Sequence, residues 1–455
     1  MTSGHGIDPA RVDALLEAET ARFEQCHPLS RQLNERARAS MPRGVPLHWM
    51  ANWPSPYPVY LAEATGTTLT DVDGNSYADF CLGDTGAMFG HANPVVAEAV
   101  REQVLRGSTT MLPTEDVIAV GEQLTRRFGL PYWQLATSAT DANRFAIRIA
   151  RIATGRDKVL VFNGKYHGSV DETQVALRDG RMVPQPGVAP NAVDLDHTTK
   201  VVEFNDVPAL EQALAGEDVA CVLAEPVMTN VGVVPAEPGY HDALRELTRR
   251  TGTLLLIDET HTISTGPGGY TRAHGLDPDL FVLGKSIAGG VPAAVYGMTE
   301  RVAEVFLRYT AKDDYRISHA GFGGTLVGNA LTLRAMRTTL EQVMTDDAYR
   351  HMAALAERFD AGVAEVIDQH RLPWHVTRLG ARVEYLFSPR APRDGGEAKR
   401  FRVPRLEAAI HLYLLNRGVL LTPFHNMALM CPATTEPDVD IHSAVFAECV
   451  KELVS

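Results

Sequence analysis

The sequence predicts an α/β protein: a large domain with a mostly parallel sheet flanked by helices, and a smaller α+β domain. From about Tyr132, short apolar runs alternate with amphipathic helical stretches. These runs are YWQLAT, KVLVFN, ACVLAEP, TLLLIDE and LFVLGK. Apolar strands that alternate with helices are typical of a parallel sheet covered on both faces.

The N-terminal region predicts helix and hairpin. Residues 8–38 form an amphipathic pattern that is interrupted near His27-Pro28. Asp73-Gly74 separates two short alternating runs, which is a strong hairpin signal. A further helix is expected from Pro94 to Leu105, where the main body begins.

The C-terminal region predicts a second, smaller unit. From about Leu331 a long helical stretch precedes the apolar pieces ARVEYLF and GVLLTPF and a closing helix. We therefore expect residues 1–85 and 331–455 to build the small domain and residues 86–330 the large one. The segment Ser388–Pro404, with its Gly-Gly and Pro residues, is expected to be a mobile loop.

Composition excludes several classes of protein. The chain has 455 residues, 45% of them hydrophobic, and a formal charge of -13, which argues against nucleic-acid or anionic-membrane partners. It has no apolar stretch of about 18 residues and no signal-peptide pattern. Its five scattered cysteines favour neither disulfides nor a structural zinc, so we expect no metal and a cytoplasmic location.

Ligands of parallel α/β sheets bind beyond the carboxyl ends of the strands, so we inspected the residues that follow each run. Ser138 and Thr140 stand at a helix N-terminus that suits a phosphate, although either could be a simple cap. Tyr166, followed by His167, could lie against a planar ring or could be packing.

The next three strand ends carry charge. Glu225 and Asp258 follow buried runs, where a carboxylate needs a partner such as a protonated heterocycle, a helix cap or a salt bridge. Lys285 follows the last run between glycines. Desolvation can lower the pKa of such a lysine, as Schiff-base chemistry requires, although a surface lysine would fit as well.

The order of these landmarks resembles that of class III aminotransferases, which have fold type I and use pyridoxal 5′-phosphate (PLP). The resemblance runs from about Pro42 to the C-terminus. GGTLVGNALTLRAM is similar to the motif of the branch that contains glutamate-1-semialdehyde aminomutase and β-amino-acid aminotransferases. The separation of Asp258 and Lys285 also suits this family.

The resemblance implies a role for each landmark. Lys285 would form the Schiff base and carry the proton, and Asp258 would keep the pyridine nitrogen protonated. The remaining cofactor-binding residues implied are Ser138, Ala139, Thr140, Tyr166, His167, Glu225, Thr260, His261, Gly324 and Thr325.

Two stretches depart from the family pattern. The phosphate turn reads Ser138-Ala139-Thr140-Asp141-Ala142 where the family has Ser-Gly-Thr-Glu-Ala. The family's Asp-Glu-Val-(Gln/Met) becomes Asp258-Glu259-Thr260-His261, which would place Thr260 behind the ring and His261 near its phenolic oxygen or the substrate.

The resemblance also implies a homodimer with shared sites, because Gly324 and Thr325 resemble the pair that reaches the neighbouring subunit's phosphate. The expected activity is ping-pong aminotransfer between small-molecule amine and keto-acid substrates. Alternatives are an aminomutase of the glutamate-1-semialdehyde type, a PLP-dependent decarboxylase or racemase, and a homologue that has lost its chemistry.

Substrate residues are less clearly marked. The branch commonly has an arginine after the Pro-Gly turn near the start of the chain, but this chain has His48, Trp49 and Met50 there. Arg382 is the alternative candidate for holding a carboxylate, and it could equally be a structural ion pair. Trp49 and Trp53 would favour an apolar or aromatic substrate group.

Overall fold

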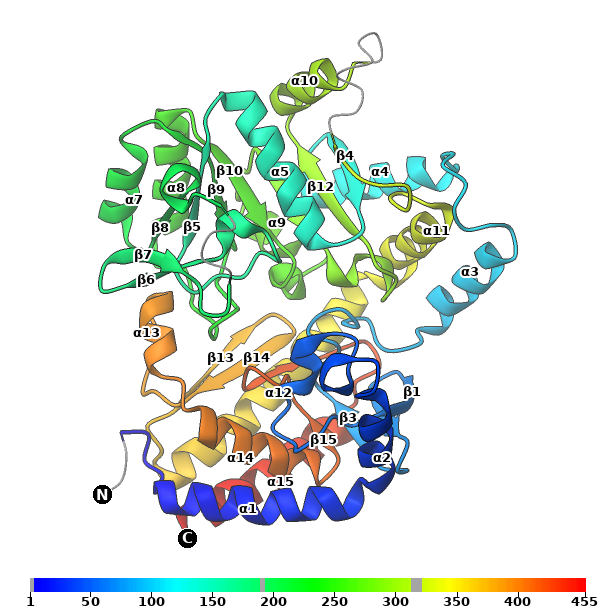
Figure 1. Ribbon diagram of the computed structural model, residues 1–455, viewed down its shortest axis with the longest axis vertical. Coiled ribbons are helices and arrows are strands. Elements are labelled where there is room, and N and C mark those ends of the chain that lie inside the picture. The colour runs from blue at the N-terminus through cyan, green and yellow to red at the C-terminus, as the bar shows by residue number, and fades with distance from the viewer. Residues whose placement is uncertain (1–3, 189–192, 312–320) are drawn as a thin grey trace. The chain divides into compact units, whose positions relative to one another are not determined.

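The computed structural model describes residues 4–188, 193–311 and 321–455 (Figure 1). Its contacts divide the chain into two compact units. Unit 1 comprises Met1–Asn93, Asp347–Ala391 and Phe401–Ser455, and unit 2 comprises Pro94–Asp346 and Pro392–Arg400. The division at residues 85/86 and 330/331 that the sequence suggested stays a prediction about domains.

Unit 2 contains a seven-stranded sheet with the order β4-β12-β11-β10-β9-β5-β8. The strands are β4 (Tyr132–Ala136), β5 (Lys158–Phe162), β8 (Thr199–Val202), β9 (Val219–Ala224), β10 (Leu254–Asp258), β11 (Leu280–Leu283) and β12 (Ala294–Met298). Each of the five predicted apolar runs forms a strand of this sheet. β12 is antiparallel to both β11 and β4, so the sheet is mixed but mainly parallel.

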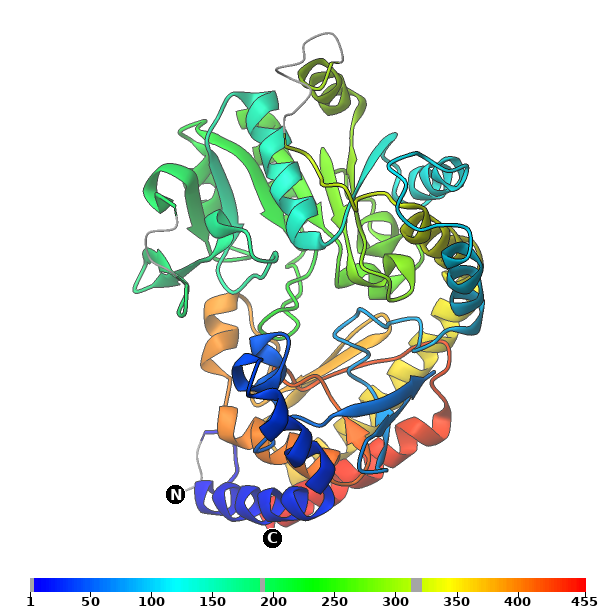
Figure 2. The ribbon, with the colours of Figure 1, turned by 45° about the vertical axis from the view of Figure 1, so that its right-hand side comes forward.

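Helices cover this sheet because their apolar sides pack on its buried residues. In α5 the predicted apolar positions Ala142, Phe145, Ala146 and Ile149 are all buried, and the helix crosses one face of the sheet (Figure 2). The helices of unit 2 are α3 (Pro94–Val104), α4 (Asp116–Phe128), α5 (Ala139–Thr154), α6 (Leu195–Thr198), α7 (Val207–Leu214), α8 (Tyr240–Thr251), α9 (Gly269–Ala273), α10 (Glu300–Tyr309), α11 (Ala330–Thr338) and α13 (Gly395–Arg400). A small hairpin, β6 (Val175–Arg178) and β7 (Arg181–Pro184), completes the unit.

Unit 1 is an α+β unit with two small sheets, β1-β2-β3-β15 and β13-β14-β16. The hairpin at Asp73-Gly74 is confirmed, since Thr70 of β2 pairs with Ser76 of β3. The strands are β1 (Leu61–Thr65), β2 (Thr68–Asp71), β3 (Ser76–Asp79), β13 (His375–Leu379), β14 (Arg382–Leu386), β15 (Val419–Leu420) and β16 (Met427–Leu429). The helices are α1 (Pro9–Cys26), α2 (Pro28–Ala37), α12 (Asp346–His370), α14 (Pro404–Leu415) and α15 (Glu436–Val454).

The segment predicted as a mobile loop contains helix α13, so that prediction is wrong for Gly395–Arg400. Ion pairs and backbone bonds anchor the segment to unit 2. Arg393 pairs with Glu237 at 2.7 Å, and the Asn205 side chain donates to the Arg393 carbonyl at 2.8 Å. These partners are distant in sequence, which is why composition alone indicated a loop.

Within the described ranges, no helix is long and apolar enough to cross a membrane. All five cysteines are free thiols, and four of them are buried. The described side chains also contain no cluster of three or more His, Cys, Asp or Glu residues suited to a metal ion.

Candidate active site

Three loops of unit 2 converge where its strands end. Gly284, at the end of β11, lies so close to the start of α5 that a Cβ there would be 2.8 Å from the Cβ of Ala139. Gly168, after β5, has a φ of +79° and packs on Thr140, whose side chain a Cβ would overlap. Glycine therefore allows the loops after β5 and β11 to reach the helix N-terminus.

The N-terminus of α5 has the geometry of an anion site. Ser138 caps the helix, because its hydroxyl accepts a hydrogen bond from the Asp141 N–H at 3.2 Å. The cap leaves the N–H groups of Ala139 and Thr140 ahead of the first helical bond, which runs from Ala142 to Ser138. Capping and anion binding are thus compatible roles for this turn.

Asp258 ends β10 and is 4% exposed. Its carboxylate accepts hydrogen bonds from His167 Nδ1 at 2.9 Å, from Asn143 Nδ2 at 2.9 Å and from the Thr260 N–H at 3.1 Å. Burial alone would raise the pKa of Asp258, but the bond and charge of His167 and the other two donors outweigh it and lower the pKa. Asp258 is therefore a buried anion at neutral pH.

Asn143 is a member of this cluster that the sequence analysis missed. It lies one turn into α5 and is fully buried. The signal was a polar residue among the apolar positions of an amphipathic helix, but its partner Asp258 is 115 residues away. The buried atoms Asn143 Oδ1 and His167 Nε2 have no hydrogen-bond partner within the described part of the chain.

Lys285 begins the short helix η5 (Lys285–Ala288), with a left-handed φ of +53°. Such a conformation is strained for a residue with a side chain and is frequent at functional sites. Its Nζ lies 2.9 Å from His261 Nε2. One residue earlier, the Gly284 N–H donates to the Thr260 hydroxyl at 3.3 Å. The structure therefore places Thr260 and His261 beside the residues at the end of β11.

Glu225 follows β9 and is 6% exposed. The Thr229 hydroxyl donates to its Oε2 at 2.5 Å. Burial raises the pKa of Glu225 to about 7, while the charge of His167 and the Thr229 bond act in the opposite direction. Glu225 can therefore hold a proton near neutral pH.

The remaining predicted cofactor residues of unit 2 are exposed. Tyr166 has 48% of its surface exposed, so a face of its ring is available to a ligand. Gly324 and Thr325 are both exposed, ahead of α11. Their predicted roles stay predictions.

The three candidate substrate residues lie in unit 1. His48 and Trp49 belong to the short helix η2 (His48–Ala51), and the Trp49 ring meets the edge of Phe424 at 5.6 Å between centroids. Arg382 is only 1% exposed, and its Nη2 donates to the Thr85 hydroxyl at 2.6 Å. The role of Arg382, as a carboxylate partner or as part of a structural ion pair, stays a prediction.

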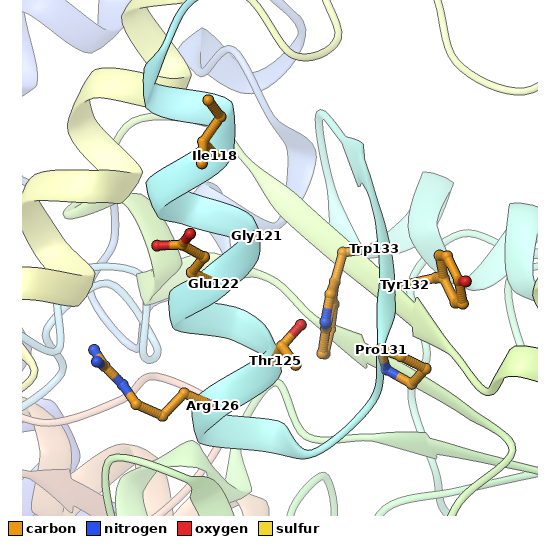
Figure 3. Close-up of a pocket in the computed structure, with 8 residues that line it drawn as sticks. All are labelled: Ile118, Gly121, Glu122, Thr125, Arg126, Pro131, Tyr132 and Trp133. Carbon is orange, nitrogen blue, oxygen red and sulfur yellow. The ribbon is translucent and has the colours of Figure 1, made fainter.

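A groove of about 550 Å³ lies between α4 and β4 (Figure 3). Ile118 and Arg126 line it from the helix, and Tyr132 and Trp133 line it from the strand. None of the predicted catalytic or cofactor residues lines it. It is a surface feature separate from the cluster at the strand ends.

Known proteins place this arrangement in a family. The pattern of the family described as Aminotransferase class-III matches residues 49–449. A glutamate-1-semialdehyde 2,1-aminomutase of Methanothermobacter thermautotrophicus is 32% identical, over 94% of this chain and 99% of that protein. A solved structure of a glutamate-1-semialdehyde-aminomutase from Pseudomonas aeruginosa PAO1, a lysine-to-alanine variant in complex with PMP, is 58% identical with a TM-score of 0.96 and covers 98% of this chain and 100% of that one.

The likeness extends to transaminases. An omega-transaminase from Sphaerobacter thermophilus is 30% identical with a TM-score of 0.85, over 94% of this chain and 98% of that one. The predicted fold type I and the predicted cofactor PLP are thereby confirmed. The chain belongs to the class III aminotransferase family of PLP-dependent enzymes.

Proposed function

We propose that this enzyme moves an amino group within one molecule, as an aminomutase of the glutamate-1-semialdehyde type. The observation that supports amine-transfer chemistry is the position of the Lys285 amine at the end of β11. It contacts His261, which follows β10, and β10 itself ends at the buried anion Asp258. The similarity to aminomutases over nearly the whole chain supports the intramolecular reaction.

The residues at the strand ends fit PLP. The N-terminus of α5 suits its phosphate, and the ionised Asp258 suits a protonated ring nitrogen. The buried, unpartnered atoms Asn143 Oδ1 and His167 Nε2 support a polar group at this place, because buried polar atoms are normally hydrogen-bonded. When bound, PLP supplies an electron sink that stabilises negative charge on the substrate carbon.

The residues of the chain then have distinct tasks. Lys285 Nζ anchors the cofactor and moves the proton at the reacting carbon. Asp258 would balance the positive charge of the protonated ring. Hydrogen bonds from His167 and Asn143 keep the Asp258 carboxylate in position. Tyr166 is half exposed and can offer a ring face, and Thr260 and Glu225 lie near Asp258.

Two measurements on the purified holoenzyme test this function. Borohydride should trap the cofactor on Lys285, and Lys285→Ala should abolish both the adduct and turnover. Lys158→Ala, which removes a partly buried lysine paired with Asp218, is the matched control and should keep both. A Lys285→Ala protein with near-normal turnover would refute the assignment.

The second candidate is intermolecular aminotransfer, which the stretch His48–Met50 favours. It has no arginine where the aminomutase branch commonly has one, and Arg382 is buried. Turnover of a single amino-aldehyde without a keto acid would support the aminomutase. A strict requirement for a keto-acid acceptor would establish the aminotransferase instead, and release of carbon dioxide or inversion of a centre would indicate a decarboxylase or racemase.

A role of Arg382 in holding a substrate carboxylate is open to a direct test. Arg382→Ala should then weaken the reaction of acidic substrates more than that of uncharged amines. Equal losses on both would mean that Arg382 only supports the fold of unit 1 through contacts such as that with Thr85. A cytoplasmic location stays a prediction.

We further propose a homodimer with shared sites. The exposed residues Gly324, Thr325 and Leu326 support it, as does exposed apolar surface on the same unit at Leu105 and Met111. Sedimentation should give a dimer. Co-expression of Lys285→Ala with Gly324→Asp, each inactive alone, should restore activity, because one site of the mixed dimer is then intact; no recovery from a proven mixed dimer would exclude sharing.

A further inference from the structure

The contact between His261 and Lys285 follows from the register of two parallel strands. Asp258 of β10 pairs with Val282 of β11, and the Glu259 N–H donates to the Val282 carbonyl at 2.8 Å. Beyond the strand ends the same register continues through side chains. Thr260 bonds Gly284, and His261 bonds Lys285, each pair being 24 residues apart.

The chemistry of the two nitrogens limits how they can share protons. A charged lysine amine only donates hydrogen bonds, so a protonated Lys285 requires His261 Nε2 as the acceptor, with the ring proton on Nδ1. A neutral Lys285 can instead accept from a protonated Nε2. Two cationic groups could not hydrogen-bond to each other at 2.9 Å, because both nitrogens would then be donors in this contact.

Lys285 needs such a partner when it is not linked to the cofactor. It must lose a proton before its nitrogen can attack an aldehyde or take a proton from carbon. His261 Nε2 lies 2.9 Å from Lys285 Nζ, which is within hydrogen-bond reach for a proton transfer between the two nitrogens. At this distance His261 Nε2 can accept the proton of the amine.

We propose that His261 positions the Lys285 amine and exchanges a proton with it whenever the amine is released from the cofactor; this deepens, and rests on, the proposed function. In the exchange the N–H bond at Lys285 Nζ breaks and one at His261 Nε2 forms, so an ammonium and a neutral imidazole become an amine and an imidazolium. The reverse transfer restores the starting state, and nothing is oxidised or reduced.

The residues that the family has at the position of His261 supply the test variants. Gln or Met stands at this place in the family, so both should be tolerated by the fold. His261→Gln keeps a strong hydrogen-bond acceptor but no proton relay, whereas His261→Met keeps only a weak acceptor. His197→Gln is the matched control, because His197 lies on the surface in α6, beside Asp157.

The experiment measures how fast the lysine link to the cofactor re-forms. Holoenzyme is mixed with an amine donor, which takes the place of Lys285 on the cofactor and leaves its amino group there. A keto-acid or aldehyde acceptor is then added to remove that amino group, and the return of the lysine-linked absorbance band is followed by stopped flow. Borohydride adducts and cofactor content are measured in parallel. We expect His261→Met to slow the return by about 10- to 100-fold and His261→Gln to slow it less, with cofactor content unchanged. His197→Gln should match the wild type.

Chemical rescue separates positioning and proton exchange from a merely structural role. Added imidazole should speed the return in His261→Ala and have no effect on His197→Ala. A wild-type rate in His261→Met, or a loss of cofactor in place of a slower return, would overturn the proposal. If wild-type protein gave no adduct on Lys285, the proposed function itself would fail, and the two failures are thus distinguishable.

Discussion

Two buried carboxylates at the ends of neighbouring parallel strands have pKa values that are shifted in opposite directions. Glu225 follows β9 and Asp258 ends β10, and the two are 6% and 4% exposed. Burial raises the pKa of Glu225 to about 7, whereas the pKa of Asp258 is lowered. The two carboxylates are therefore similarly buried but differ in their charge near neutral pH.

The difference lies in the donors that each carboxylate meets. Asp258 receives a hydrogen bond and a nearby positive charge from His167, with two more bonds from Asn143 and Thr260. Glu225 has the hydroxyl of Thr229 and feels the charge of Asp258, which raises its pKa further. In this sheet the strand end brings an acid to the site, and the neighbouring elements decide whether it is charged there.

Removing the charge at the end of β10 should have the largest effect. Asp258→Asn keeps the shape of the side chain but loses the anion that the cofactor ring requires, so we expect kcat to fall by about 1000-fold. Glu225→Gln, the matched change on β9, should lower kcat by less than about 10-fold. Steady-state kinetics on both holoenzymes would check this, and equal losses would mean that the two acids are equivalent.

Removing the main donor should make Asp258 behave more like Glu225. In His167→Ala, Asp258 keeps two donors but loses the strongest, so its pKa should rise. A protonated Asp258 cannot pair with a cationic ring, so cofactor affinity should fall by about 10-fold as the pH drops from about 8 to about 5. Wild type should vary little over this range, and a flat profile in His167→Ala would show that the donor is dispensable.

The strand-end rule explains why much of the cluster was predictable. Parallel strands bring their carboxyl ends to one edge, so Asp258 and Lys285 could both be placed at that edge from the apolar runs that precede them. The register of β10 and β11 is not encoded in that order, so the contact between His261 and Lys285 was not predictable.

The other features that the sequence analysis did not predict depend on partners that are distant in the sequence. Asn143 donates a hydrogen bond to Asp258, 115 residues away, and Arg382 of β14 donates one to Thr85, 297 residues away. The antiparallel β12 and the anchoring of α13 were missed for the same reason, because composition and periodicity describe only local preferences. Patterns in a single sequence reveal which residues stand at strand ends but not which distant residues neutralise them.

The pKa of Glu225 should also make stability depend on pH. The folded pKa of about 7 exceeds the ordinary value of 4.5, so between these two values the folded state binds more protons than the unfolded state. The stabilisation from this group is complete below pH 4.5 and is lost as the pH rises through about 7.

Glu225→Gln has no such proton to lose, and its amide oxygen can still accept a hydrogen bond from Thr229. The variant should therefore gain about 2.5 kcal/mol on wild type between about pH 5 and about pH 8 in urea unfolding. Because Asp258 has the opposite shift, a stability difference between variant and wild type that stayed constant from about pH 5 to about pH 8 would mean that Glu225 is a buried anion like Asp258. That result would remove the contrast between the two strand ends.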